Sequence, residues 1–515
     1  MSKKKQIILL FFLFSFSTYC AISIGQSWDE GFHLYQGKIT LDYLFSLGRI
    51  DKDISYREFY SPFYWSIQYL LTKIFPLKYQ IEASHFINLI FSLGVIFAIG
   101  KLSKELFNEK VSKIVFLVLF FYPVFFGHMG FNPKDTILAF SHVWIFYSIL
   151  KYLKNQTNRY VTNIGILAAM GTGIQPFFLG SLIPIFIFLI YEIFIFKKIV
   201  NENFNKKKFF YDLLKCFFIF YILLVIFWPD THSNIFVLPF KTIMKTLSNA
   251  NFYAGYPYNL INENYYFSTE IPKSYLLINF IYKSPEYFLI TYLFFAALLI
   301  NSKNFFINKF KLFNYKLLLL ILILLYPNLI VLFFPYPIYD GMRLFLWTLP
   351  YFCLIPGLTI YYLIGNLKFL KVKIAFILLC LCFFYFLINF LIITPYQYTY
   401  LNIFNGKMET RYQKFENDYW GGSIKELINK SNLDFNKTIK FATCGVNAKV
   451  AKYYLKKKGN HNFKFVSAND ASYIIMTNRV TWNGNFITCF DNFKGTNISK
   501  VERNNLILSV IRKID

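Results

Sequence analysis

Long apolar segments recur along most of the chain, and they constrain its fold more than any other feature. A helix needs about 20 apolar residues to cross the roughly 30 Å hydrocarbon core of a bilayer. Eleven segments of the 515-residue chain approach this requirement. We expect membrane-spanning helices at 6–24, 83–100, 112–127, 136–150, 160–175, 177–196, 213–229, 284–301, 316–334, 344–365 and 372–393. The segments at 136–150 and 160–175 are short, so one of them could be re-entrant or tilted.

The composition supports a membrane protein. Hydrophobic residues make up 56% of the chain and charged residues only 16%, whereas soluble domains carry about 25% charged residues. Such a chain cannot cover a water-exposed surface, which excludes a secreted soluble enzyme and a disordered scaffold. The formal net charge is +27. Because the cations are spread over short loops, we expect membrane lipids as partners and no nucleic acid.

Basic residues gather in every second loop between the apolar segments. These loops lie at 3–5, 101–113, 151–159, 197–215, 303–316 and 368–373. By the positive-inside rule they face the cytoplasm, which puts the N-terminus inside and, after eleven spans, residues from 394 onward outside. We therefore predict a multi-pass protein of the bacterial cytoplasmic (inner) membrane. Residues 6–24 could instead be a signal peptide, but no clean cleavage site follows, so we favour an uncleaved first helix.

The C-terminal tail differs in pattern from the rest of the chain. Short β-rich runs alternate there with helical patterns; the runs are 438–443, 463–467, 471–477 and 505–512, and the helical patterns are 423–430 and 447–457. We predict a transmembrane domain at 1–393 and a small extracytoplasmic α/β domain at 394–515. An outside location would permit a disulfide between Cys444 and Cys489. Within the long outside loop 25–82, the runs Leu41–Leu47 and Phe63–Leu71 suit helices lying along the membrane.

Carboxylates near lipid are costly, so they are candidates for function. Three junctions between a loop and a helix carry them on the predicted outer side. Asp29 and Glu30 follow the first span, Asp135 precedes the fourth, and Asp340 lies with Arg343 between the ninth and tenth. Nearby residues that could contact a substrate are Lys134, His128 and Glu58.

Each candidate also has a structural interpretation. Asp29 and Glu30 could simply end a helix in water. Asp135 follows Asn132-Pro133, a helix-start pattern, so it could be a first-turn charge favoured by the helix dipole. Arg343 could be an interfacial anchor, and His128, like His33, is more typical of local hydrogen bonding than of metal binding.

Transfer of a sugar from a lipid phosphate to an acceptor hydroxyl would use this set of residues. The anomeric carbon becomes oxocarbenium-like, and a carboxylate must accept the acceptor proton. Cations or a metal ion must stabilise the departing phosphate. Asp29 would be the base, and Arg343 with Lys134 would meet the phosphate. Glu30 and Asp135 would orient substrates or hold a divalent metal ion, the only cofactor that the sequence suggests.

Four sequence blocks resemble one family. The acidic pair in WDEGFHLYQG (28–37) resembles membrane glycosyltransferases of the GT-C superfamily, family 39-like, which include protein O-mannosyltransferases and bacterial lipid A aminoarabinose transferases. FFGHMGFNPKDTILAF (125–140) is similar to the second-loop acidic motif of the bacterial relatives. Later blocks of the same group resemble IYDGMRLFLWTLP (338–350) and PYQYTYLNIFNG…FENDYWGGSIKEL (395–427). The resemblance covers roughly 25–430.

This resemblance implies a GT-C-like fold and an inverting glycosyltransferase, hexosyl or pentosyl. Its donor would be a sugar on polyprenyl phosphate, and its acceptor a glycan, a lipid or a protein. Asp29 would be the base, and Asp135 would match the second-loop acid. Three alternatives stay open: a transporter or flippase for lipid-linked sugars, which would favour mid-span charges and inverted repeats; a non-catalytic assembly or receptor protein that uses the tail for binding; and a glycan polymerase or ligase. The segment 418–423 (DYWGGS) could fold back near the site or only cap a helix.

Overall fold

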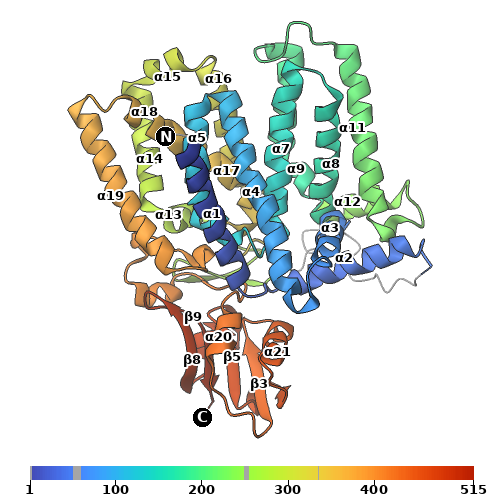
Figure 1. Cartoon of the computed structure of the whole chain (residues 1–515), viewed down its shortest axis with the longest axis vertical. Coiled ribbons are helices and arrows are strands. Elements are labelled where there is room, and N and C mark those ends of the chain that lie inside the picture. The colour runs from blue at the N-terminus through green and yellow to red at the C-terminus, as the bar shows by residue number, and fades with distance from the viewer. Residues whose placement is uncertain (1–2, 50–59, 249–254, 334–335, 515) are drawn as a thin grey trace.

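A computed structural model describes residues 3–49, 60–248, 255–333 and 336–514, and it has two regions. Helices form a bundle, and a smaller domain built on a sheet lies at one end of it (Figure 1). The first half of the bundle contains α1 (Lys3–Ser23), α2 (Glu30–Phe45), α3 (Phe63–Thr72), α4 (Gln80–Leu106), α5 (Glu109–Phe120), α6 (Pro123–His128), α7 (Asp135–Lys154), α8 (Asn158–Ile174), α9 (Phe178–Ser181), α10 (Ile183–Tyr191) and α11 (Lys206–Ile226).

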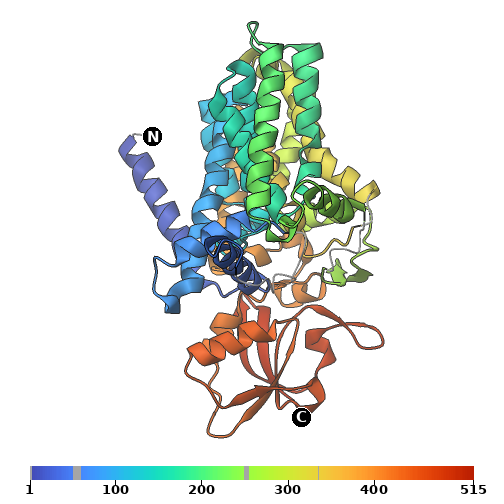
Figure 2. The same ribbon diagram turned by 90° about the vertical axis from the view of Figure 1, so that its right-hand side faces the viewer.

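The second half of the bundle begins with a surface helix and ends with a long apolar one. It contains α12 (Leu238–Ser248), α13 (Tyr275–Lys283), α14 (Glu286–Asn301), α15 (Lys303–Lys309), α16 (Phe313–Phe333), the 3-10 helix η5 (Arg343–Thr348), α17 (Leu349–Phe352), α18 (Leu354–Gly365) and α19 (Leu370–Ile392). In Figure 2 the N-terminal helix α1 stands at one side of the bundle.

Several of these helices are suited to a bilayer. Among the described residues, seven are long and apolar enough to cross a membrane, and the bent pair α13–α14 would be an eighth. Large apolar side chains on α11 and α19 point outward, with Phe218 65% and Leu381 60% exposed, as expected for helices that face lipid. The protein is therefore a multi-pass membrane protein.

The eleven predicted spans all coincide with helical segments, but some of these segments are broken. The segment 112–127 divides into α5 and α6 at Pro123, which starts a new helix. The segment 177–196 comprises α9, α10 and a π-helical turn at Glu192–Phe196. Because these pieces are short, the count of eleven spans stays a prediction.

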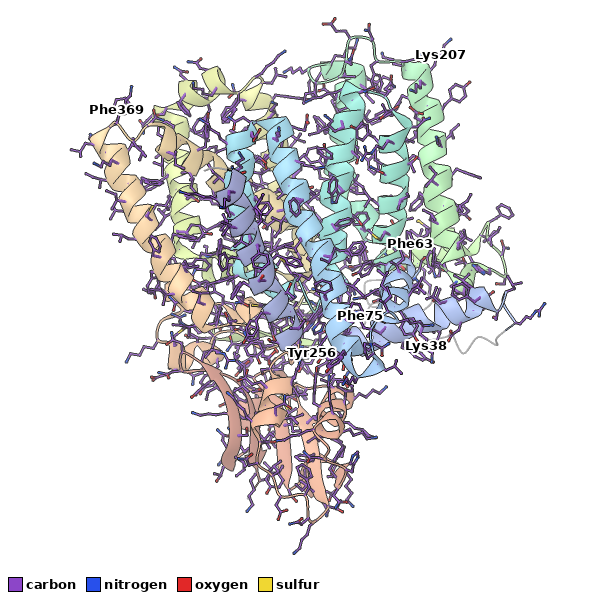
Figure 3. The ribbon with its side chains drawn as sticks, viewed as in Figure 1. Lys38, Phe63, Phe75, Lys207, Tyr256 and Phe369 are labelled. Carbon is purple, nitrogen blue, oxygen red and sulfur yellow. A yellow bond between two sulfur atoms is a disulfide. The ribbon has the colours of Figure 1, made fainter. Side chains whose placement is uncertain are left out.

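The two ends of the bundle differ in their connections. Lys207 and Phe369 mark loops at the end far from the sheet domain, whereas Tyr256 lies beside that domain (Figure 3). At the domain-side end, α2 lies across the bundle. It crosses α3 closely, because a Cβ on Gly37 would be 2.2 Å from the carbonyl oxygen of Trp65. The predicted helices at Leu41–Leu47 and Phe63–Leu71 are thus present.

The C-terminal domain is a mixed sheet with helices against it. Its five strands have the order β4-β3-β5-β9-β8, in which β3 is parallel to β4 and β5, and β9 is antiparallel to β5 and β8. The strands are β3 (Ile439–Cys444), β4 (Phe463–Phe465), β5 (Tyr473–Thr477), β8 (Thr496–Arg503) and β9 (Leu506–Lys513), and the helices are α20 (Ile424–Lys430), α21 (Ala448–Lys457) and α22 (Cys489–Asn492). A disulfide joins Cys444 to Cys489.

Two hairpins and a close backbone contact join this domain to the bundle. The hairpin β1–β2 (Tyr258–Ile261 and Asn264–Phe267) belongs to the loop before α13, and β6–β7 (Val480–Trp482 and Phe486–Thr488) belongs to the C-terminal domain. The ring of Phe486 packs on Phe267 and Tyr265 across the junction. The amide of Gly25, just after α1, donates to the carbonyl of Gly422 at 2.8 Å. The sequence predicted neither hairpin.

Candidate active site

Arg343 is the centre of the polar site at this junction. It begins η5 and is 1% exposed. Its Nε lies 3.4 Å from Oδ2 of Asp340 and 3.7 Å from Oδ2 of Asp135. Within the described parts of the chain this Nε has no hydrogen-bond partner. The closest approach in both ion pairs is at Nε, and the terminal nitrogens donate no hydrogen bond to any residue that the structure describes, so they can bind another anion. A buried arginine is not an interfacial anchor, so that interpretation is wrong.

Two aromatic rings pack against the guanidinium group of Arg343. Its Cζ lies 4.5 Å from the ring centre of Trp420 and 5.0 Å from that of Tyr339. Cations over aromatic faces are attracted by the ring quadrupole. The segment before Arg343 has an unusual backbone, since both Asp340 (φ 60°) and Gly341 (φ 64°) are left-handed. A non-glycine residue in this conformation is uncommon and often marks a functional constraint.

Asp135 is held by the Asn132-Pro133 turn. The side-chain oxygen of Asn132 accepts the backbone N–H of Asp135 at 2.9 Å, and its amide nitrogen donates to Oδ2 of Asp135 at 3.0 Å. The other carboxylate oxygen, Oδ1, is buried and has no hydrogen-bond partner in the described residues. Asp135 is in the first turn of α7, as its structural interpretation expected, and it also faces Arg343. The two interpretations are therefore compatible.

The two members of the acidic pair have different surroundings. Glu30 is fully buried and begins α2; its oxygens accept from Nε2 of His85 at 2.8 Å, from the hydroxyl of Ser84 at 3.0 Å and from the amide of Ser27 at 3.3 Å. Asp29 is partly exposed and occupies the N-cap position of α2 without a side-chain cap bond. Thus the pair starts a helix and does not end one.

Asp29 belongs to the same electrostatic environment as Arg343. Its carboxylate interacts electrostatically with Arg343, Asp135 and Tyr339. The neighbouring Trp28 ring is 6.0 Å from the guanidinium carbon of Arg479. The three junctions that the sequence singled out, at 29–30, 135 and 340–343, therefore converge.

The other candidates differ in their involvement. Lys134 is buried and donates to the hydroxyl of Tyr60 at 3.3 Å. His128 uses both ring nitrogens, with Nε2 2.8 Å from the hydroxyl of Tyr419 and Nδ1 3.2 Å from the amide of Asn132, which fits a local hydrogen-bonding role. Glu58 lies outside the described residues.

The C-terminal region supplies side chains that the sequence did not identify. Asp418 accepts the backbone N–H of Gly422 at 2.8 Å and that of Ser423 at 3.0 Å, and it also accepts the hydroxyl of Tyr398. These bonds fix the DYWGGS turn, so that Trp420 covers Arg343 while Ser423 is the N-cap residue of α20. The segment thus both reaches the site and caps a helix. The contact between Trp420 and Arg343 links residues 77 positions apart, and no local pattern signals it.

Buried acids in this region titrate abnormally. Burial raises the pKa of Glu416 from its ordinary value of 4.5 to about 7, although the guanidinium of Arg479 opposes the shift. Burial also raises the pKa of Asp418. Among the described residues, no three or more His, Cys, Asp or Glu side chains are grouped to hold a metal ion. The oxygens of Glu30 already accept hydrogen bonds within the protein. The metal site at Glu30 and Asp135 stays a prediction.

An apolar cavity adjoins the polar site. Its volume is about 510 Å³, and Lys134 and Tyr339 are part of its lining. The rest of the lining is mostly apolar, with Leu138, Phe178, Ile330, Leu344, Phe345 and Trp347 among its residues. One cationic group, that of Lys134, thus lies at the edge of an apolar space, an arrangement that suits a ligand with an anionic head and a hydrocarbon chain.

The fold is similar to that of solved membrane proteins. ArnT from Cupriavidus metallidurans bound to undecaprenyl phosphate matches with a TM-score of 0.50 and 10% identity over 99% of this chain and 98% of that one; its apo state matches with a TM-score of 0.49, 10% identity and the same coverage. The Archaeoglobus fulgidus oligosaccharyltransferase AglB, in complex with an inhibitory peptide and a dolichol-phosphate, has a TM-score of 0.46 and 11% identity over 92% of this chain and 70% of that one. No family model and no curated protein matches the sequence. The similarity to ArnT confirms the predicted GT-C-like fold.

Proposed function

We propose that this protein is an inverting glycosyltransferase that moves a sugar from polyprenyl phosphate to an acceptor hydroxyl at the outer face of the membrane. One observation carries the proposal. Arg343, a fully buried arginine, approaches both carboxylates through Nε and packs on Tyr339, which together with Lys134 helps to line an apolar cavity. Asp135 and Asp340 compensate the buried charge at Nε, and a lipid phosphate would supply an anion for the terminal nitrogens together with a chain for the cavity.

The chemistry of transfer assigns a role to each residue. The acceptor oxygen attacks the anomeric carbon while the bond from that carbon to the phosphate oxygen breaks, so the configuration inverts. Asp29 accepts the acceptor proton. Arg343 and Lys134 stabilise the charge that develops on the leaving phosphate. Asp135 and Asp340 hold Arg343 in place, and Glu30 fixes the start of α2 through His85, which keeps Asp29 in position.

The sugar is a hexose or a pentose, and the acceptor is a glycan, a lipid or a protein. ArnT was solved with undecaprenyl phosphate and AglB with a dolichol-phosphate and a peptide, so both kinds of partner have a precedent in this fold. A direct test is mass spectrometry of surface glycolipids and glycoproteins from a deletion strain. Loss of one sugar from one acceptor, restored by the wild-type gene but not by Asp29→Asn, is expected. A flippase would instead remain active in the Asp29→Asn strain.

The orientation proposed is that of an inner-membrane protein with the N-terminus inside and the C-terminal domain outside. The basic loops support this orientation, since the loops near Lys207 and Phe369 lie far from the C-terminal domain. The disulfide between Cys444 and Cys489 also supports it, because disulfides persist in oxidising compartments. A cysteine introduced at exposed Lys452 should react with an impermeant maleimide added outside, and one at Lys207 should not. Labelling at position 207 and not at position 452 would show that the orientation is the opposite one.

A further inference from the structure

A buried arginine extends from the C-terminal domain into the site. Arg479 follows β5 and is 2% exposed. Its Nη2 donates to Oδ1 of Asp340 at 2.8 Å, and its Nη1 donates to the carbonyl of Tyr419. Its Cζ lies 3.5 Å from the ring centre of Tyr256. This side chain therefore connects the C-terminal domain to the bundle segment that carries Arg343.

Five buried ionisable side chains, alternately acidic and basic, form a row through the junction. Glu416 Oε1 is 3.5 Å from Nε of Arg479, and Arg479 contacts Asp340 at 2.8 Å. Asp340 is 3.4 Å from Arg343, which is 3.7 Å from Asp135. The tightest of these contacts is therefore the one between Arg479 and Asp340. Since buried charges depend strongly on their partners, removal of one charge must change the pairing of its neighbours.

Without Arg479, two buried cations would remain near Asp340: Arg343, whose Nε is 3.4 Å from it, and Lys283, which interacts electrostatically with both Asp340 and Glu416. The terminal nitrogens of Arg343 would then be drawn to both oxygens of Asp340, in the bidentate geometry that arginine and carboxylate favour. The left-handed backbone at Asp340 and Gly341 would also lose the contact with Arg479 as a restraint. The hydrogen bond from the hydroxyl of Tyr275 to the carbonyl of Gly341, at 3.1 Å, would remain.

We propose that Arg479 is a positioning residue: by pairing with Asp340, it keeps the terminal nitrogens of Arg343 free for the phosphate of the lipid donor. This inference rests on the proposed function. It gives the C-terminal domain a part in donor binding, and it explains why an arginine remains buried at a junction between two regions.

The test measures binding of undecaprenyl phosphate to the full-length protein in detergent by native mass spectrometry. We expect Arg479→Gln to weaken binding at least tenfold, because Arg343 becomes occupied by Asp340. Asp340→Asn added to Arg479→Gln should recover most of the loss, because a neutral side chain neither needs Arg479 nor captures Arg343. A purely structural role for Arg479 would not give this recovery.

Arg503→Gln is the matched control. Arg503 is also an arginine of the C-terminal domain, near the end of α19; it donates to the carbonyl of Thr394, pairs with Glu426 and lies 5.0 Å from the ring centre of Tyr396. These contacts do not involve Asp340, so its variant should bind within twofold of the wild type. If Arg479→Gln fails to fold, Arg479→Lys replaces it, since lysine cannot bridge Asp340 and the Tyr419 carbonyl in the same way.

The outcomes separate the inference from the proposed function. Unchanged binding by Arg479→Gln, or by Arg479→Lys where the glutamine variant does not fold, overturns the inference, as does the absence of recovery in the double variant. Arg343→Gln is measured in parallel. If that variant binds undecaprenyl phosphate as well as the wild type, the proposed function fails and not merely the role of Arg479.

Discussion

The two ends of the helical bundle carry their charges in different ways. At the end that meets the C-terminal domain, Asp135, Asp340 and Arg343 are at most 3% exposed. At the opposite end, the side chains of Lys104, Lys113 and Glu109 form ion pairs while 58–59% exposed. Exposed pairs gain little and cost little, whereas buried charges are costly to desolvate.

This difference indicates where function has shaped the molecule. Well-packed apolar residues would stabilise the junction as well as or better than ion pairs, so stability alone does not explain the buried row. The exposed lysines of the opposite end need no such explanation, because exposed charges cost little and basic residues are common in the short loops of membrane proteins. Substitutions at the two ends should therefore differ in what they change.

The largest difference is expected in catalysis. Asp29→Asn should reduce sugar transfer by at least about 100-fold, since a positioned general base contributes a factor of this order or more. Membrane insertion and binding of undecaprenyl phosphate should persist. Glu109→Gln, at the opposite end, should retain full transfer activity. Wild-type turnover in the Asp29 variant would remove Asp29 from the role of base.

A somewhat smaller effect is expected for donor affinity. Arg343→Ala should raise the KM for the lipid-linked donor about tenfold or more, because a charge-assisted contact with the phosphate is lost. Lys113→Ala is the control from the opposite end and should leave the KM unchanged. Unaltered donor kinetics in the Arg343 variant would contradict phosphate binding by this residue.

For stability, the C-terminal domain should be more sensitive than the loops of the opposite end. Replacing Cys444 and Cys489 by serine should destabilise this domain by about 2–4 kcal/mol, a typical contribution of one disulfide. Thermal unfolding followed by limited proteolysis of the domain measures the change. Replacing Cys380 in α19 by serine is the control and should not alter it. Equal resistance of all three proteins would indicate that the disulfide is absent in the native protein.

The smallest effect expected is a pH dependence. The pKa of Glu416 is about 7 when folded and 4.5 ordinarily, so the folded state binds more protons between these values. The stability contributed by this group should therefore fall as pH rises from 4.5 to 7 and stay constant above it. Glu416→Gln should flatten the Tm profile across this window, as measured by differential scanning fluorimetry. A profile of unchanged slope would contradict the shifted pKa.

The fold could largely be predicted from the sequence because its signals are local. Apolar segments mark the spans, and the runs at 438–443 and 505–512 match β3 and β9. Breaks within the spans are harder to predict, because a proline does not always interrupt a helix. Pro123 divides one predicted span into two helices, whereas Pro327 lies inside a continuous helix. The π-helical turn at Glu192–Phe196 has no clear sequence signal.

The candidate site was predictable only in part. Asp29, Asp135 and Arg343 could be proposed because charges next to apolar segments are conspicuous. The partners Arg479 and His85 could not, and Trp420 only through the segment 418–423 that contains it, because their importance depends on contacts between distant segments. His85, for example, lies inside an apparent span and becomes significant only through its 2.8 Å contact with Glu30.

The backbone contact between Gly25 and Gly422 has a consequence for biosynthesis. A Cβ on Gly25 would lie 2.7 Å from the carbonyl oxygen of Gly422, so not even a methyl group fits between a segment that the ribosome makes early and one that it makes late. Asp29 and Glu30, which follow Gly25, therefore lack their neighbouring segment around Gly422 until almost four hundred further residues have been translated. A nascent chain that stops before that point would have inserted helices without the Trp420 ring that packs on Arg343.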